Sequence, residues 1–223
     1  MQTSERRQQL GEALIVAAER AIEARGLSGL KARNLAQEVG CAVGAIYNVF
    51  ADLDDLILRA NLRTLASFEA LIEASRSSTR AAEGSGDPEA AVSDLIRLAQ
   101  VYLKFASERR FLWRALFEHR MSGGTSPPAW YMKEQVRLFR YIEEPLRALQ
   151  PGLTHEERAL LARSLFSAVH GIVSLGLDEK LMVLPLNVLQ EQTDRVVRAL
   201  GRGLLTIPAD RQGAGKRECR GDG

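Results

Sequence analysis

The chain has 223 residues, 46% of them hydrophobic and 26% charged, and it carries a formal net charge of +2. This composition allows one or two globular domains and excludes an intrinsically disordered chain. It also excludes a strongly basic protein that binds nucleic acid through charge alone. A basic DNA-binding face would therefore have to arise from the arrangement of charges rather than from their number.

Signals for export or membrane insertion are missing from the sequence. Its start lacks the apolar core of a signal peptide, and no run approaches about 18 uninterrupted apolar residues. Of the two cysteines, Cys41 lies in a predicted turn and Cys219 in a Gly-rich tail. We therefore expect a cytoplasmic protein without a membrane span and without a structural disulfide.

Nearly all of the apolar periodicity is helical, and no segment alternates convincingly as a strand would, so we predict an all-α fold. Gly26 is expected to end the first helix, and Asp52 with Asp55 to cap the long fourth helix. The predicted helices, about nine in all, cover roughly residues 8–25, two short segments within 34–50, and residues 53–75, 88–107, 111–121, 130–149, 154–177 and 186–205.

Cap and breaker residues mark the later boundaries. Asp87 followed by Pro88 indicates a helix start, and Thr154 begins a full capping box. Pro145 is expected to kink or interrupt the helix around it. Loops are predicted at residues 75–87 and 122–128, and the tail from residue 208 is expected to be disordered.

Residues 34–50 are the most informative segment, because they predict two short helices joined by a tight turn. Gly40 is the residue type expected where a helix ends in a left-handed conformation. Apolar residues recur at helical spacing on both sides of it, at Leu35, Ala36, Val39, Ile46, Val49 and Phe50. This arrangement is a helix-turn-helix, whose second helix enters the major groove of DNA.

The same region resembles the tetracycline-repressor (TetR-type) family of bacterial transcription regulators. The residues that carry the resemblance are Ala17, Gly26, Arg33, Leu35, Ala36, Val39, Gly40, Gly44, Ile46, Tyr47, Phe50 and Leu56. A weaker likeness, at 102–106 and at Val169-His170-Gly171, is to a subgroup with a Trp-His-Gly signature in its C-terminal domain. The resemblance implies an all-helical homodimer that binds a palindromic double-stranded DNA operator and a small-molecule inducer.

We expect three regions along the chain. Residues 8–53 form a helix-turn-helix DNA-binding domain, residues 54–207 a C-terminal ligand-binding and dimerisation domain, and residues 208–223 the tail. The fourth helix leaves the first domain and enters the second without a flexible linker. Such a shared helix would couple the two domains mechanically.

The sequence departs from the family pattern at positions where polar residues are usual. Ala42 opens the recognition helix in place of Ser or Thr, and Leu30 replaces a Thr that often caps the preceding helix. Losing one such cap typically costs about 1 kcal/mol. Other polar positions of the family are taken here by Val43, Ala45, Asn48 and Leu53. Several phosphate contacts are therefore missing.

The candidate DNA-binding residues lie in and just before the helix-turn-helix. We expect Tyr47 to donate to a phosphate, Asn48 to contact a base edge, and Lys31 and Arg33 to neutralise backbone charge. The remaining candidates are Val43, Gly44 and Ala45, which would allow close approach to the groove and contact with a thymine methyl. The alternative is that all seven are ordinary surface and core residues of a helical bundle.

The candidate ligand-binding residues are mostly aromatic and come from the middle helices. They are Tyr102, Phe105, Trp113, Phe117, Met121, Trp130, Phe139 and His170. The alternative is that this apolar stripe is plain core. His119 and His170 are candidate polar anchors or buried core histidines. A group of arginines (Arg109, Arg110, Arg114 and Arg120) is either a solvated face or a site for an acidic ligand.

The last two helices are expected to form the dimer interface, as a four-helix arrangement of two chains. The expected contacts are Leu160, Leu161, Leu165, Ala168, Val169, Gly171, Ile172, Val173, Leu186, Leu189, Val196, Val197 and Leu200, although the same stripes could instead face the core of one chain. No catalytic motif, metal-ligand spacing or cofactor loop is present. We therefore predict a ligand-responsive, non-enzymatic DNA-binding regulator, most often a repressor in this family. The alternative is a dimeric small-molecule or protein-binding module with weak or lost DNA binding.

Overall fold

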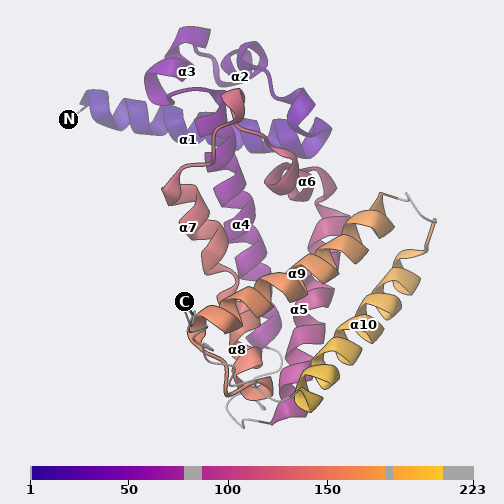
Figure 1. Cartoon of the computed structure of the whole chain (residues 1–223). Helices are drawn as coiled ribbons and strands as arrows, with labels where there is room; N and C mark the ends of the chain where they lie inside the picture. Colours follow the sequence, from indigo (N-terminus) through magenta and orange to yellow (C-terminus); the bar gives the residue numbers. More distant parts are fainter. Residues whose placement is uncertain (1, 78–86, 179–182, 208–223) are drawn as a thin grey trace, which may run out of the picture.

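The computed structural model describes residues 2–77, 87–178 and 183–207, and these residues form helices without any strand, as predicted. There are ten α-helices in the described part, one more than expected (Figure 1). In chain order the elements are α1 (Gln2–Arg25), the 3-10 turn η1 (Leu27–Gly29), α2 (Ala32–Val39), α3 (Val43–Val49), α4 (Leu53–Ser77), α5 (Pro88–Glu108), α6 (Arg110–Glu118), the 3-10 turn η3 (Ser122–Gly124), α7 (Ala129–Arg137), α8 (Arg140–Leu149), α9 (His155–Leu177) and α10 (Leu186–Thr206).

The extra helix arises because the chain bends earlier than predicted. Pro145 was expected to interrupt the segment, but it lies inside α8. The break falls instead at Leu138 and Phe139, where backbone N–H groups bond three residues back, from Leu138 to Gln135 and from Phe139 to Val136. These tighter turns redirect the chain between α7 and α8.

The predicted helix caps of the later elements are confirmed. The Asp87 side chain accepts from the N–H of Glu89 at 3.1 Å at the start of α5. At α9, Thr154 and Glu157 exchange the two bonds of a capping box. At α4, Asp52 accepts from the Asp55 N–H at 2.8 Å. Most of the predicted loop at 75–87, the predicted tail and Cys219 lie outside the described residues, so the tail's disorder and the missing disulfide stay predictions.

Helices α1 to α3 form a compact head at one end of the molecule (Figure 1). Its core is a single cluster of buried side chains centred on α1 and closed by Leu35 of α2, Ile46 of α3 and Leu56 of α4. Leu112 and Ala115 of α6 belong to the same cluster, although they lie more than fifty residues further along the chain. The head core is thus built from the N-terminal helices together with α4 and α6.

The rest of the chain forms a larger helical body that α4 enters from the head (Figure 1). Helix α10 packs along α5, where Gly201 faces Val92 and Gln100 donates to Asp194 at 2.7 Å. Helix α9 crosses this pair, and it approaches α10 closely at Gly176. A Cβ at Gly176 would lie only 2.5 Å from the Leu189 side chain.

Helix α9 is the one described helix that is long and apolar enough to cross a membrane, by length and composition only. A single such helix is weak evidence for a membrane protein, because the core helix of a soluble protein passes the same test. Only 11% of its most apolar window is fully buried within the chain, and the exposed large apolar residues of α9 are Leu160 and Leu175.

Candidate nucleic-acid interface and ligand pocket

The turn between α2 and α3 has the geometry that the sequence predicted. Gly40 ends α2 in the left-handed conformation, at φ 75° and ψ 36°. The N–H of Cys41 then donates to the Ala36 carbonyl at 2.9 Å, which closes the helix end. Helix α3 begins two residues later, after an extended Ala42. The sequence therefore positions α3 through one glycine and one short turn.

The starts of both helices lack side-chain caps, as expected from the departures at Ala42 and Leu30. The residue that precedes α2, however, is Lys31 and not Leu30, and its side chain makes no capping bond. Leu30 is 8% exposed and belongs to the head core, so an apolar residue there contributes packing instead of a hydrogen bond.

Helix α3 has one buried and one exposed face. Ile46 is fully buried, and Phe50 just after the helix is 3% exposed. On the other face Tyr47 is 50% exposed and Val43 40% exposed. Gly44 and Asn48 are also exposed, as are Lys31 and Arg33 next to α2, whereas Ala45 is half-buried. Within the described part of the chain, neither Lys31 nor Arg33 makes an ion pair.

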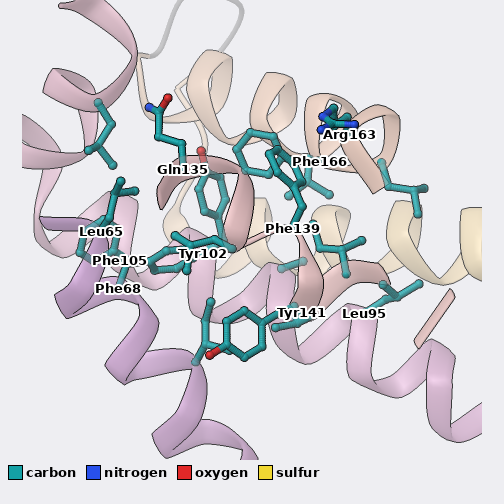
Figure 2. Close-up of a pocket in the computed structure, with 18 of the residues that line it drawn as sticks. Leu65, Phe68, Leu95, Tyr102, Phe105, Gln135, Phe139, Tyr141, Arg163 and Phe166 are labelled. Carbon is teal, nitrogen blue, oxygen red and sulfur yellow. The ribbon is translucent and has the colours of Figure 1, made fainter. Parts of the chain in front are cut away.

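A cavity of about 390 Å³ lies in the body and is lined by residues of all helices from α4 to α10 (Figure 2). Five of the predicted ligand-binding residues line it, namely Tyr102, Phe105, Trp113, Phe117 and Phe139. The break between α7 and α8 contributes Leu138 and Phe139, so the bend described above shapes one wall. The volume lies in the range of about 300–1,000 Å³ that is typical of small-molecule sites.

The other three predicted residues do not line this cavity. Met121 follows the end of α6, where the chain turns toward the head. Trp130 is 39% exposed, contacts the Arg59 guanidinium, 5.3 Å from the ring centre, and lines a second pocket next to the cavity. His170 lies behind the cavity wall, where its ring contacts Phe117.

His170 ends a chain of hydrogen bonds that begins at the cavity wall. The indole N–H of Trp113 donates to the Tyr102 hydroxyl at 2.8 Å, and this hydroxyl lies 2.6 Å from Nδ1 of His170. An indole can only donate, so the Tyr102 oxygen accepts from Trp113; a neutral His170 protonated on Nε2 would accept the Tyr102 proton at Nδ1. Burial lowers the pKa of His170 and raises the pKa of Tyr102, which favours this neutral arrangement.

Helix α6 connects the cavity to the head. Its Trp113 and Phe117 line the cavity, while Leu112 and Ala115 on the other side are each 1% exposed in the head core. The Asn61 amide of α4 donates to the Ala115 carbonyl at 3.2 Å. Helix α6 therefore touches both the cavity and the head core within nine residues.

The chain that follows α6 is tied to the start of α4 by a buried carboxylate. Asp54 accepts from the N–H of Ser122 at 2.7 Å, and Nε2 of His119 lies 3.4 Å from its other oxygen. Burial lowers the pKa of His119, and Asp54 and Asp52 act in the opposite direction. His119 therefore lies at the junction of body and head, away from the cavity.

The arginines around α6 are mostly paired with acids on the outside of the protein. Arg109 contacts Glu23 at 2.9 Å, Arg110 contacts Asp178 at 3.1 Å, and Arg114 contacts Glu118 at 2.7 Å. Arg120 is exposed. None of the four lines the cavity, so this cluster has the properties of a solvated face.

The expected dimer stripes are only partly exposed. Val173, Leu189 and Val197 are buried within the chain, which corrects their assignment to a free face. Leu161, Leu165, Val169 and Ile172 are half-buried against the body core. The exposed members are Leu160 (64%), Leu186 (48%), Val196 (37%), Leu200 (38%) and Ala168.

Two family models match the chain, and together they span most of it. Residues 14–60 match the model described as "Bacterial regulatory proteins, tetR family", and residues 95–200 match "Tetracyclin repressor-like, C-terminal domain". The chain belongs to the TetR family. TetR-family regulators are DNA-binding proteins and not enzymes, so the protein is a TetR-type transcriptional regulator. No curated protein matches the sequence.

Solved structures with the TetR fold are similar over nearly the whole chain. A protein of unknown function from Rhodococcus sp. RHA1 is 24% identical, with a TM-score of 0.64 over 88% of this chain and 95% of its own. RolR in complex with resorcinol is 19% identical, with a TM-score of 0.59 over 94% and 100%. The multidrug binding protein EbrR complexed with imidazole is 23% identical, with a TM-score of 0.56 over 90% and 97%.

Sequence reasoning missed much of the wall of the cavity in this TetR-family chain. Phe166 of α9 lines it and packs edge-on against Phe139, with ring centres 5.4 Å apart. Phe68, Gln135, Tyr141 and Arg163 also line it. Phe166 belongs to an apolar helix whose residues could face a cavity, the core or a partner. Periodicity alone does not distinguish these surroundings.

Proposed function

We propose that this TetR-family regulator is a homodimeric repressor that dissociates from its operator DNA when a small molecule binds. The observation that carries the DNA-binding part is the exposure of α3. Tyr47 and Val43 face outward from a helix whose opposite side is anchored by Ile46 and Phe50. A short helix presented in this way matches the geometry of recognition helices in the major groove.

In this proposal the seven candidate residues make different contacts with DNA. Tyr47, Lys31 and Arg33 contact phosphates, because each is exposed and offers a hydrogen-bond donor. Asn48 contacts a base edge, and Val43, Gly44 and Ala45 permit close approach to the groove. Residues 8–53, which include most of α1 and all of α2 and α3, act as the DNA-binding domain, and residues 54–207 bind the ligand and the second subunit.

The cavity in the body is the proposed ligand site, and α6 is the proposed route to the head. A molecule that occupies the cavity would press on Trp113 and Phe117, and α6 could then move only with Leu112 and Ala115 in the head core. The junction of Asp54 with Ser122 passes the same movement to the start of α4. Ligand and operator would then oppose each other by a reciprocal coupling of order 1–3 kcal/mol.

A second copy of the chain is the proposed cover for α9. Leu160, Ser164, Ala168, Gly171 and Leu175 share one face of α9 at about 100° per residue, and we call this set the α9 stripe. Leu160 is 64% exposed and Leu175 41% exposed. Small residues between them suit close helix packing across a two-fold axis. The two recognition helices would then meet half-sites about one DNA turn apart.

The alternative is a dimeric small-molecule or protein-binding module in which strong DNA binding has been lost. The uncapped starts of α2 and α3 favour it, because neither Lys31 nor Ala42 makes a side-chain capping bond. The apolar Val43 and Ala45 also remove two polar contacts.

The test is a gel-shift titration of DNA from upstream of the protein's own gene, at low and at moderate salt. The regulator is expected to bind, and Tyr47→Ala is expected to abolish the shifted band while the melting temperature stays unchanged. Arg147→Ala, an exposed change on α8, is the matched control and should bind as the parent does. Equal binding by Tyr47→Ala and the parent would contradict the assigned role of α3.

A further inference from the structure

The described wall of the cavity carries positive charge and no negative charge. Among the described residues that line the cavity there is no aspartate or glutamate, and Arg163 is the only charged side chain. The other lining residues are apolar or aromatic, apart from the Gln135 amide and two tyrosine hydroxyls. A bound cation would therefore find no carboxylate at this wall, and burying a charge without a partner is costly.

The tyrosine hydroxyls at the wall are already engaged within the protein. Tyr102 accepts from Trp113 and bonds to His170, as described above. The Tyr141 hydroxyl bonds to Glu73 and Glu69 and accepts from Arg140. Of these two carboxylates, Glu69 is also paired with Arg137 at 2.6 Å. These groups offer a ligand little new hydrogen bonding.

Arg163 differs, because its side chain makes no hydrogen bond or ion pair with any described residue. Its guanidinium lies 5.6 Å from the ring centre of Phe139, which itself lines the cavity (Figure 2). Arg163 shares a face of α9 with Phe166 and His170, one and two turns further on. The helical geometry turns this face away from the centre of the α9 stripe, so the side chain lies between the cavity and solvent.

A guanidinium in this position has a clear chemical preference. It presents five donors in a planar fork that matches a carboxylate in two parallel hydrogen bonds. Because Arg163 is still exposed to solvent, the resting protein pays no large desolvation penalty for leaving it unpaired. An acid that arrives with an apolar body would bury that body against Phe139 and Phe166 and place its anionic group at the rim.

We propose that the cavity binds a lipophilic acid, with its apolar body among the aromatic side chains and its carboxylate paired with Arg163. The Gln135 amide, whose N–H donates to the Tyr131 hydroxyl at 3.2 Å, is a second polar contact at the wall. This inference rests on the proposed use of the cavity as the ligand site. It also predicts that the binding affinity of the site decreases from an anion to a neutral molecule to a cation of the same apolar body.

The experiment compares three probes that differ only in the head group, namely decanoate, decanol and decyltrimethylammonium, each kept below its micelle-forming concentration. Isothermal titration calorimetry gives the affinity, and the fluorescence of Trp113, measured in a Trp130→Phe background, reports entry into the cavity. Decanoate is expected to bind roughly tenfold more tightly than decanol, and the cation weakest of all. Arg163→Gln is expected to lower the decanoate affinity roughly tenfold and to leave decanol nearly unchanged.

Arg147→Gln is the matched control, because it removes an exposed arginine of α8 that does not line the cavity. Equal binding of decanoate and decanol would overturn the proposal, as would unchanged decanoate binding in Arg163→Gln or failure of all three probes to bind. A gel shift with decanoate present tests the proposed function separately. Decanoate that binds through Arg163 without releasing DNA would leave the ligand class standing and contradict the coupling to the head.

Discussion

At the residue scale, Gly44 is informative because nothing in the chain requires a glycine there. It lies in the first turn of α3, and a Cβ at this position would meet nothing within 4 Å. A glycine inside a helix lowers stability relative to alanine by roughly 0.5–1 kcal/mol. Close approach of α3 to a groove of DNA would explain why a glycine is present at position 44.

Gly44→Ala is therefore expected to change stability and DNA binding in opposite directions. The free energy of unfolding should rise by about 0.5–1 kcal/mol, because the helix gains propensity without a clash. The affinity for the operator should fall roughly tenfold, because the added methyl keeps α3 away from the base pairs. Urea denaturation and gel-shift titration measure the two effects. A variant that is more stable and binds DNA equally well would remove Gly44 from the interface.

His170 predicts a specific loss of stability in acid. Burial lowers its pKa in the folded protein below the usual value of 6.5. The unfolded chain therefore binds more protons than the folded chain in the window between the two pKa values, and unfolding becomes easier as the pH falls below about 6.5. The stabilisation that comes from keeping His170 neutral is complete above that pH and is lost progressively below it.

The comparison that isolates this effect is the parent against His170→Gln. The urea midpoint of the parent should fall more steeply between pH 7 and pH 5 than that of the variant. The urea midpoint of His170→Gln should still fall somewhat over this pH range, because burial also lowers the pKa of His119. Identical slopes for the two proteins would show that His170 does not carry the acid response.

The positions of some residues could be predicted from the sequence, and those of others could not. Gly40 and Ile46 were predictable, because a left-handed helix end and a buried spacing are local properties of the chain. Trp113 and Phe117 were predicted near a cavity, but the same reasoning also put Met121 and Trp130 there. Arg163 gave no signal at all, since its position depends on how α9 crosses the body.

At the element scale, α6 and the break between α7 and α8 are the features with the greatest consequences. The sequence predicted a helix near residues 111–121 but not that its two sides belong to different cores. Likewise Pro145 suggested the wrong position for the break, because a proline can be accommodated within a helix whose neighbours hold it. Such outcomes depend on tertiary packing, which local pattern does not contain.

The close contact of α9 with α10 gives a prediction for Gly176. An alanine Cβ would lie 2.5 Å and 2.7 Å from the two methyl carbons of Leu189, which is 3% exposed, so the buried Leu189 side chain would have to shift. Gly176→Ala should therefore lower the free energy of unfolding by roughly 1–3 kcal/mol. Gly203→Ala on α10, where a Cβ meets nothing within 4 Å, is the control and should be neutral or stabilising. Equal stability of both variants would contradict the close packing of these helices.

At the scale of the whole molecule, the exposed residues of the α9 stripe, Leu160 and Leu175 among them, are the proposed contact with a second copy of the chain. We predict that the purified protein is a dimer by sedimentation equilibrium. Adding charge to the α9 stripe with Leu160→Glu and Leu175→Glu together should yield a monomer, because like charges would face each other across the two-fold axis. Leu71→Glu on α4, also at an exposed leucine, should remain dimeric. A stripe variant that is still dimeric would place the interface elsewhere.

The central claim is that two outward-facing α3 helices, held by a symmetric body, recognise DNA. The most direct measurement is selection of bound duplexes from a random pool by the purified protein, with Tyr47→Ala selected in parallel. We predict enrichment of a palindrome whose half-sites lie about one helical turn apart, and no enrichment by the variant. No enriched sequence with the parent protein, or the same sequence with Tyr47→Ala, would contradict the claim and favour the binding module without strong DNA affinity.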